Sequence, residues 1–208
     1  MDHNPIVDNP RSAAALARAA ALIRGGGLVA YPTDTVYALG CDPRDPAAVA
    51  RLFDAKGRDA RRASPLIGAS IGQLSSAVEF TATAQRLAEI FWPGPLSLVM
   101  MARSEISRLA LGGLDTAAVR VPADATARNL AEAAGFAITA TSANISGQPP
   151  VARASLISSA LASQLDFILD GGTLAGGAVS TIVDVTGDAP QLVRAGAIAW
   201  DRVLESLR

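Results

Sequence analysis

The amino-acid sequence predicts an α/β (α+β) protein, a single domain in which helices flank a twisted mixed β-sheet. Helix-like and strand-like segments alternate along the chain, which is typical of this fold class. The length of 208 residues fits one domain. Half of the residues are hydrophobic and the mean hydropathy is +0.30, so the chain can bury a substantial core.

Capping residues and turn residues place the elements of the N-terminal half. Ser12 can cap a helix that continues to Arg24 and ends at the three glycines that follow. A buried strand over 28–31 leads into a threonine-rich turn, and Pro46 begins a helix that runs to Phe53. The other elements expected in this half are a strand over 65–70, a helix over 73–91 and a strand over 96–101.

The same signals continue through the C-terminal half. A strand over 117–121 ends at Pro122, and a helix over 126–134 ends at Gly135. The remaining elements expected are a strand over 137–141, a helix over 155–165, strands over 167–170, 181–185 and 192–194, and a helix over 200–207. Because no repeat or change in composition divides the chain, we expect one domain over 12–208, preceded by a flexible tail over 1–11.

Composition excludes several kinds of function. The formal net charge is −1, so no overall basic field attracts nucleic acid or an anionic membrane. One cysteine, Cys41, and one histidine, His3, leave no disulfide framework and almost no scope for histidine catalysis or a Cys/His metal site. The polar start of the chain does not resemble a secretory signal, and no apolar run is long enough to span a membrane. We therefore expect a soluble cytoplasmic protein with no membrane partner.

Polar and charged residues gather where the predicted strands end, which is where α/β proteins hold ligands. They are the Thr33-Asp34-Thr35 turn, a basic segment over 54–62, Arg120, and the Ser142-Ala143-Asn144 turn. Each also has a purely structural interpretation: a satisfied turn, a solvated face, a salt bridge or a helix cap. Because no Walker or dinucleotide-binding motif is present, the residues alone indicate an anion-binding α/β domain that is not a P-loop protein.

Two basic residues are notable for their positions. All but one of the 18 basic residues are arginine, and the exception, Lys56, lies beside Arg58. Arg120 lies in an otherwise apolar strand, where a charge is costly unless it is paired or faces a ligand. Arg120 could form a structural salt bridge with Asp34 or Asp184, or it could clamp a substrate carboxylate with its planar fork.

Seven segments resemble, in their order, the YrdC-like threonylcarbamoyl-AMP synthases. They are YPTDTVYALG, AKGR, WPGPLSLV, DTAAVRVP, TSANISGQPP, STIVDV and LVRAGAI, and the likeness extends over residues 12–208. The chain resembles the short, single-domain form. The resemblance implies an open concave ligand groove and the conversion of L-threonine, bicarbonate and ATP to L-threonylcarbamoyladenylate and pyrophosphate. This product supplies the threonylcarbamoyladenosine (t6A) modification of tRNA.

The resemblance also implies roles for individual residues. Lys56 and Arg58 would be catalytic and, with Ser142 and Asn144, would hold ATP phosphates and the acyl phosphate. Further nucleotide contacts would come from Thr116, Pro150 and Arg194. The residues implied to hold threonine are Thr33, Arg120, Ala140 through its backbone, and Ser180.

No protein metal ligands are implied, and Mg²⁺ would accompany ATP. The partners implied are a downstream threonylcarbamoyl-transferase complex and a weak contact with tRNA or double-stranded RNA.

Two positions depart from the family pattern. Asp59 follows the Lys-x-Arg motif and residues 61–64 lengthen the loop, while Ala69 stands where many members have histidine.

Two other functions compete with the synthase. A carbamoyl-transfer domain like those of hydrogenase maturation proteins is disfavoured because those chains are long and rich in cysteine. A non-catalytic module that binds double-stranded RNA or the ribosome is disfavoured by the net charge.

Overall fold

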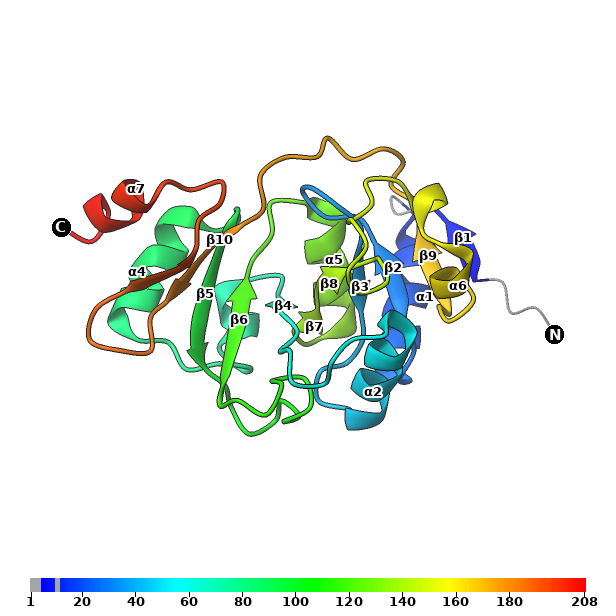
Figure 1. The fold of residues 1–208 in the computed structure, drawn as a ribbon, viewed down its shortest axis with the longest axis horizontal. Helices are drawn as coiled ribbons and strands as arrows, with labels where there is room; N and C mark the ends of the chain where they lie inside the picture. The colour runs from blue at the N-terminus through cyan, green and yellow to red at the C-terminus, as the bar shows by residue number, and fades with distance from the viewer. Residues whose placement is uncertain (1–4, 10–11) are drawn as a thin grey trace.

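The computed structural model describes residues 5–9 and 12–208, and its strands form two open mixed sheets (Figure 1). The five-stranded sheet has the order β1 (Ile6–Asp8), β9 (Phe167–Leu169), β2 (Val29–Tyr31), β3 (Ala38–Gly40) and β8 (Thr141–Ser142). The six-stranded sheet has the order β11 (Gln191–Arg194), β10 (Thr181–Asp184), β5 (Leu96–Met101), β6 (Thr116–Arg120), β4 (Leu66–Ile67) and β7 (Ile138–Thr139). Both sheets contain parallel and antiparallel pairs.

Helices cover both sheets. They are α1 (Ala13–Arg24), α2 (Pro46–Lys56), α3 (Ile71–Leu74), α4 (Ala82–Phe91), α5 (Ala125–Ala134), α6 (Ser159–Ala162), α7 (Trp200–Glu205) and the 3₁₀ turn η1 (Ala154–Leu156). In Figure 1, α4 and α7 lie at the end of the molecule that holds β5 and β10, while α1, α2 and α6 lie with β2 and β9. Side-chain caps fix the helix starts: Ser12 accepts from Ala15 N–H and Asp45 accepts from Ala47 N–H.

Three connections carry the chain from one sheet to the other, and all three lie near the candidate site. Only Ala140 separates β7, in the six-stranded sheet, from β8, in the five-stranded sheet. The segment 170–180, which we call the strap, connects β9 to β10 across the top of Figure 1. A third connection runs from β3 through α2 and the loop 57–65 to β4. Ligand-binding residues can therefore come from both sheets within a short distance.

Two apolar clusters hold the sheets and helices together. The larger contains fully buried side chains such as Leu52, Leu87 and Val183. The smaller packs α1 and α5 together, with Ala19 and Leu130 among its buried residues. Alanine at many of the helix contact positions lets these helices approach their neighbours closely.

The predicted fold class is confirmed, but the strands divide between two sheets. The helix expected over 73–91 is wrong in its first half. Helix α3 ends at Leu74, and Val78 forms an isolated β-bridge with Ala102. A new helix, α4, then begins after Thr81, whose side chain accepts the N–H of Ala84. The helix expected over 155–165 is also too long, since only η1 and α6 form there.

Strand predictions need three corrections. The strand expected over 137–141 is broken at Ala140, whose N–H bonds to Pro65 O outside either ladder. Strand β3 is an addition to the predicted elements, since the sequence signals there indicate only the turn before it. Residues 6–8, within the expected tail over 1–11, form the edge strand β1, which pairs with β9; residues 1–4 and 10–11 of that tail lie outside the described residues.

Candidate functional site

A cleft with a volume of about 350 Å³ lies between the two sheets. Its walls come from the loop after β2, from β8, from the strands β4, β5, β6 and β10, and from the ends of β11 and the strap. Eight of the residues predicted for the site line it: Thr33, Arg58, Arg120, Ala140, Ser142, Pro150, Ser180 and Arg194. Residues separated by more than 160 positions in the sequence therefore meet at one surface.

Arg120 lines the cleft and also forms a salt bridge with Asp34, one of the two carboxylates that the sequence offers as partners. Its Nη1 lies 2.9 Å from Asp34 Oδ2, and both side chains are mostly shielded from water. Within the described part of the chain this is the one hydrogen bond that the guanidinium makes. The two interpretations of Arg120 are thus compatible, because its other N–H groups remain available to a ligand.

Arg194 enters the cleft from the opposite side, on the edge strand β11. Its Nε and Nη2 donate to Ser180 O at 3.2 and 2.8 Å, and Nη2 also lies 3.1 Å from Ser180 Oγ. Burial and the nearby charge of Arg120 both lower the pKa of Arg194. An anion placed between these two arginines would relieve their mutual repulsion.

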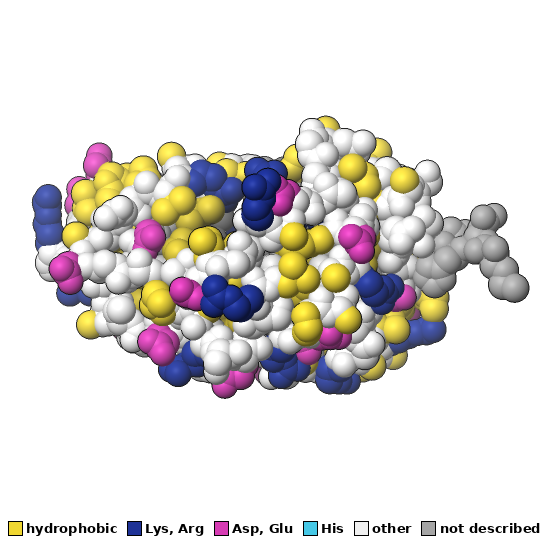
Figure 2. All heavy atoms as spheres, turned by 60° about the horizontal axis from the view of Figure 1, so that its bottom comes forward, with side chains coloured by type: hydrophobic (Ala, Val, Ile, Leu, Met, Phe, Trp, Pro, Cys, Tyr) yellow, Lys and Arg dark blue, Asp and Glu magenta, His cyan; other side chains and the backbone are white. Residues whose placement is uncertain are grey.

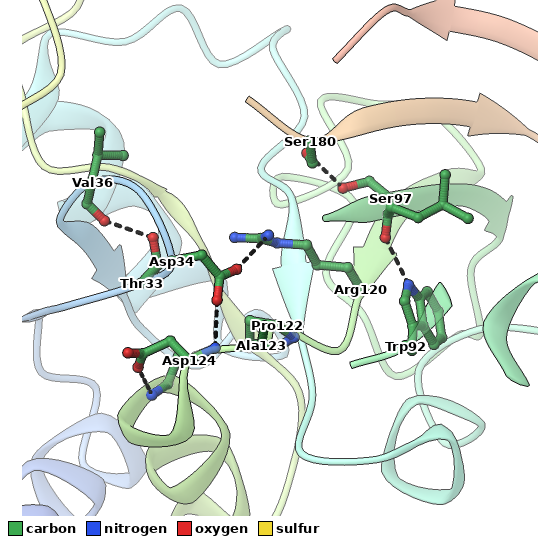
Figure 3. A network of polar contacts seen from close by, with 12 residues as sticks. Thr33, Asp34, Val36, Trp92, Ser97, Arg120, Pro122, Ala123, Asp124 and Ser180 are labelled. Atoms are coloured by element: carbon green, nitrogen blue, oxygen red, sulfur yellow. Dashed lines mark hydrogen bonds and ion pairs between the residues drawn. The ribbon is translucent and has the colours of Figure 1, made fainter. Parts of the chain in front are cut away.

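Ser97 is a site residue that the sequence analysis missed. It lies on β5, lines the cleft, and its hydroxyl is 3.0 Å from that of Ser180. Figure 3 shows the two hydroxyls facing each other beside Arg120. A signal was present, because Ser97 is the one polar residue in the otherwise apolar segment LSLVMM.

Arg58 organises the lengthened loop that follows α2. Its Nε and Nη2 donate to the carbonyls of Arg62 and Ala63, at 3.2 and 2.6 Å. Its Nη1 donates to Thr141 Oγ1 at 2.9 Å, which ties the loop to β8. Burial, followed by the charge of Arg62, lowers the pKa of Arg58. The extra residues 61–64 therefore wrap around Arg58 and leave it at the cleft wall.

Lys56 and Asn144 lie behind the cleft wall rather than on it. Lys56 is 2 % exposed, and its Nζ donates to the carbonyls of Ser142 and Asn144. The Asn144 amide donates to Ile145 O and Gln148 O, and among the described residues nothing donates to its buried Oδ1. Ser142 faces the cleft and Ala143 is buried in the core, as the alternation of an extended segment predicts.

The structure also shows the surroundings of Thr116, Thr33 and Ala69. Thr116 does not line the cleft, but it shares the face of β6 that carries Ala118 and Arg120, four residues from the latter. Thr33 is almost fully buried and its hydroxyl donates to Val36 O at 2.6 Å. Ala69, the second departure from the family pattern, packs against the smaller apolar cluster and does not line the cleft.

The donor set of the cleft suits an anion that brings its own counter-ion. The lining residues include three arginines and several hydroxyls but no carboxylate. Within residues 5–9 and 12–208, no group of three or more His, Cys, Asp or Glu side chains could hold a metal. A hard cation such as Mg²⁺ would fit here as part of a nucleotide, held mainly by phosphate oxygens.

Charge elsewhere on the surface is mixed. Figure 2 shows acidic and basic side chains interspersed on one face of the molecule. No helix within the described residues is long and apolar enough to cross a membrane.

The fold and the cleft define an α/β domain with a cleft between two sheets, into which the arginines of β6, β11 and the loop after α2 project. Residues 21–196 match the Sua5_yciO_yrdC family model, whose description is "Telomere recombination". The chain belongs to this Sua5/YciO/YrdC family.

Two relatives and one solved structure illustrate the similarity. The threonylcarbamoyl-AMP synthase of Pyrococcus abyssi is 42% identical over 89% of this chain and 55% of its own length. The Nitrosococcus oceani protein of the same name is 41% identical over 74% of this chain and 84% of its own length. The crystal structure of P. abyssi Sua5 complexed with L-threonine matches with a TM-score of 0.89 and 38% identity, over 98% of this chain and 60% of that one. The chain thus spans little more than half of the archaeal relative.

Proposed function

We propose that this chain is a threonylcarbamoyl-AMP synthase, which makes L-threonylcarbamoyladenylate and pyrophosphate from L-threonine, bicarbonate and ATP. The observation that carries the proposal is the convergence of Arg58, Arg120 and Arg194 on one cleft whose lining residues include no carboxylate. Such a surface suits a reaction in which a carboxylate and a triphosphate are held side by side. Relatives that bear this enzyme's name support the same conclusion.

The reaction needs alignment and charge neutralisation more than covalent chemistry. The amine of threonine combines with bicarbonate to give a carbamate, and water leaves. A carbamate oxygen then forms a bond to the α-phosphorus of ATP, while the bond from that phosphorus to the bridging oxygen breaks and pyrophosphate leaves. Mg²⁺ carried by ATP would offset part of the phosphate charge.

The described residues can divide this work within the cleft. Arg120, with one Nη paired to Asp34, offers its other N–H groups to the threonine carboxylate, and Thr33, Ser180 and the backbone of Ala140 complete the threonine contacts. Arg58 and Arg194 face the phosphates, with Ser142 and Pro150 beside the nucleotide. Lys56 and Asn144 act from behind the wall by holding the Ser-Ala-Asn turn. Thr116 extends the same face of β6 towards the nucleotide.

The product is an activated mixed anhydride, so an acceptor enzyme must consume it. We propose a threonylcarbamoyl-transferase complex acting on tRNA as that partner, with a weak contact between this chain and tRNA.

Pyrophosphate release provides the test. We expect release that requires ATP, L-threonine and bicarbonate together, and loss of at least about tenfold for Arg194→Ala, since a phosphate contact made in the transition state supports that much rate. Arg103→Ala is the matched control, because Arg103 is also an exposed arginine whose Nε bonds to a backbone carbonyl, that of Ser75, and it lies outside the cleft. Release that is independent of threonine would contradict the proposal. Absence of synthesis together with salt-sensitive binding of double-stranded RNA would favour the non-catalytic alternative.

A further inference from the structure

A single carboxylate, that of Asp34, joins the two walls of the cleft. Asp34 lies in the loop between β2 and β3, in the part of the chain that belongs to the five-stranded sheet. Its Oδ2 pairs with Arg120 Nη1 on β6, at 2.9 Å, and its Oδ1 accepts the backbone N–H of Asp124, which caps α5. Figure 3 shows the side chain reaching across to both partners, with Thr33 beside it.

This bridge fixes the direction of the Arg120 fork. The side chains of Arg120 and Asp34 are only 15% and 18% exposed, so the pair is much less screened than one on the surface. A free arginine has many rotamers, and holding one of them before a ligand arrives lowers the entropic cost of two-point recognition. Because Asp34 is itself held by the Asp124 amide, the fork is anchored to two separate elements.

The bridge also makes Arg120 electrostatically different from the other two arginines of the cleft. Within the described residues, Arg58 and Arg194 bond only to carbonyl and hydroxyl oxygens, so each presents its full charge. The positive charge of Arg120 is offset by Asp34. A nearly neutral ion pair suits a singly charged or zwitterionic ligand, while uncompensated arginines suit a polyanion.

We propose that Asp34 is a positioning and specificity-determining residue, which aims Arg120 at the carboxylate of the amino-acid substrate and excludes phosphate groups from that position. This inference rests on the proposed function. It distinguishes Arg120, whose charge is balanced by Asp34, from Arg58 and Arg194, whose charges are not. A negative carboxylate beside Arg120 repels a multiply charged phosphate more strongly than a single carboxylate.

Titration calorimetry of L-threonine, with and without inorganic phosphate, tests the inference. Asp34→Asn keeps the size of the side chain and a hydrogen-bond acceptor but removes the charge. We expect it to weaken L-threonine binding by about tenfold, the order of effect of losing one charge-assisted contact. We also expect millimolar phosphate to compete with threonine in the variant but not in the wild-type chain. The competition is the deciding readout, because a structural role alone would not create it.

Asp166→Asn is the matched control. Asp166 also combines an arginine and a backbone N–H, pairing with Arg51 at 3.2 Å and accepting from Leu28 N–H at 2.7 Å, and it lies outside the cleft. We expect it to lose stability without changing threonine affinity or phosphate competition. Should Asp34→Asn fail to fold, Asp34→Glu decides the matter: its retained charge should still exclude phosphate while the longer stem displaces Arg120 and weakens threonine binding.

Threonine affinity in Asp34→Asn within twofold of wild type, without phosphate competition, would overturn the inference; so would an Asp34→Glu variant identical to wild type. If the wild-type chain makes the adenylate and Asp34→Asn behaves like it, only this inference fails. If the wild-type chain binds no threonine and releases no pyrophosphate, the proposed function fails and the role of Asp34 with it.

Discussion

The position of the only lysine follows from its size. Lys56 is buried at the end of α2, and its ammonium group donates to two carbonyls of the same tight turn, those of Ser142 and Asn144. In return, the Lys56 carbonyl accepts the N–H of Ser146 at 2.8 Å. A guanidinium is a wide planar fork and cannot replace a compact ammonium between two nearby oxygens. This explains why a chain that uses arginine elsewhere has lysine here.

The titration of Lys56 is the prediction at this scale. Burial, followed by the charge of Arg58, lowers its pKa to about 8. Between that value and about 10.4, the ordinary lysine pKa, the folded chain binds fewer protons at this side chain than the unfolded chain. The contribution of Lys56 to the free energy of unfolding therefore rises as the pH rises through that range. Because there is one lysine, ¹³C-labelled lysine gives a single side-chain resonance.

We expect that resonance to titrate near pH 8 in the folded protein and near the ordinary value in urea. Arg58→Ala should raise the midpoint, since it removes the second cause of the shift. An ordinary midpoint in the folded wild-type chain would mean that the ammonium is solvated, contrary to the contacts described.

At the scale of elements, two loops support each other beneath the cleft. Ser64 N–H donates to Ala110 O at 2.8 Å, which joins the loop after α2 to the segment before β6. Gly112 lies at this junction with φ +62°, and a Cβ there would be 2.6 Å from Arg61 O and 2.7 Å from Ala63 N. The backbone approach that places Ala63 O on Arg58 therefore requires glycine.

Adjacent glycines make this testable. Gly112→Ala should destabilise the protein and reduce ATP-dependent activity, because the loop that holds Arg58 must move. Gly113 also has a positive φ, +83°, but a Cβ there meets nothing within 4 Å. Gly113→Ala should therefore cost only the left-handed backbone strain, about 1–2 kcal/mol, with little change in KM for ATP. Thermal denaturation and kinetics distinguish the two; equal effects on both measurements would contradict the loop contact.

Elements with clear end signals were predictable, and those decided by tertiary contacts were not. The α1 helix has a serine cap and a glycine stop, and it forms as expected. The segment over 73–91 has a helical apolar pattern throughout, but its middle turns away so that Val78 can pair with Ala102. At Ala140 the sequence carries no Gly, Pro or charge that would end a strand, and the strand breaks because its two ends pair in different sheets.

The candidate site likewise contains residues that local sequence predicts and residues whose positions depend on tertiary contacts. Residues in recognisable motifs, such as Arg120 and Arg194, meet at the cleft as the family resemblance implied. The pairing of Asp34 was one of two options in the sequence, because nothing in the chain order says which carboxylate reaches Arg120. That Lys56 lies behind the wall was not predictable, because a buried ammonium and a ligand-facing one share the same local sequence.

At the scale of the whole molecule, the cleft is lined by residues of both sheets, and three chain connections join those sheets. A ligand that contacts both walls should therefore stabilise the whole fold, by about 2.7 kcal/mol at a concentration 100 times its Kd. We expect L-threonine and α,β-methylene-ATP, which cannot release pyrophosphate, each to raise the Tm. Hydrogen exchange should slow in the loop 32–37 and the strap but not in α1. No change in Tm with either compound would contradict binding at this cleft.

Lys56 is the one lysine of the chain, and its burial gives the protein a single basic side chain that loses its charge in mildly alkaline solution. Burial also raises the pKa values of Tyr37 and Cys41 to about 12, and the other basic residues apart from a single histidine are arginines, which stay charged. Few side chains other than Lys56 therefore titrate between neutral pH and about 12, so alkaline buffer makes the formal net charge of −1 at pH 7 only slightly more negative. Electrostatic repulsion between molecules stays weak over this range, and colloidal stability must come from added salt or bound polyanions rather than from a higher pH.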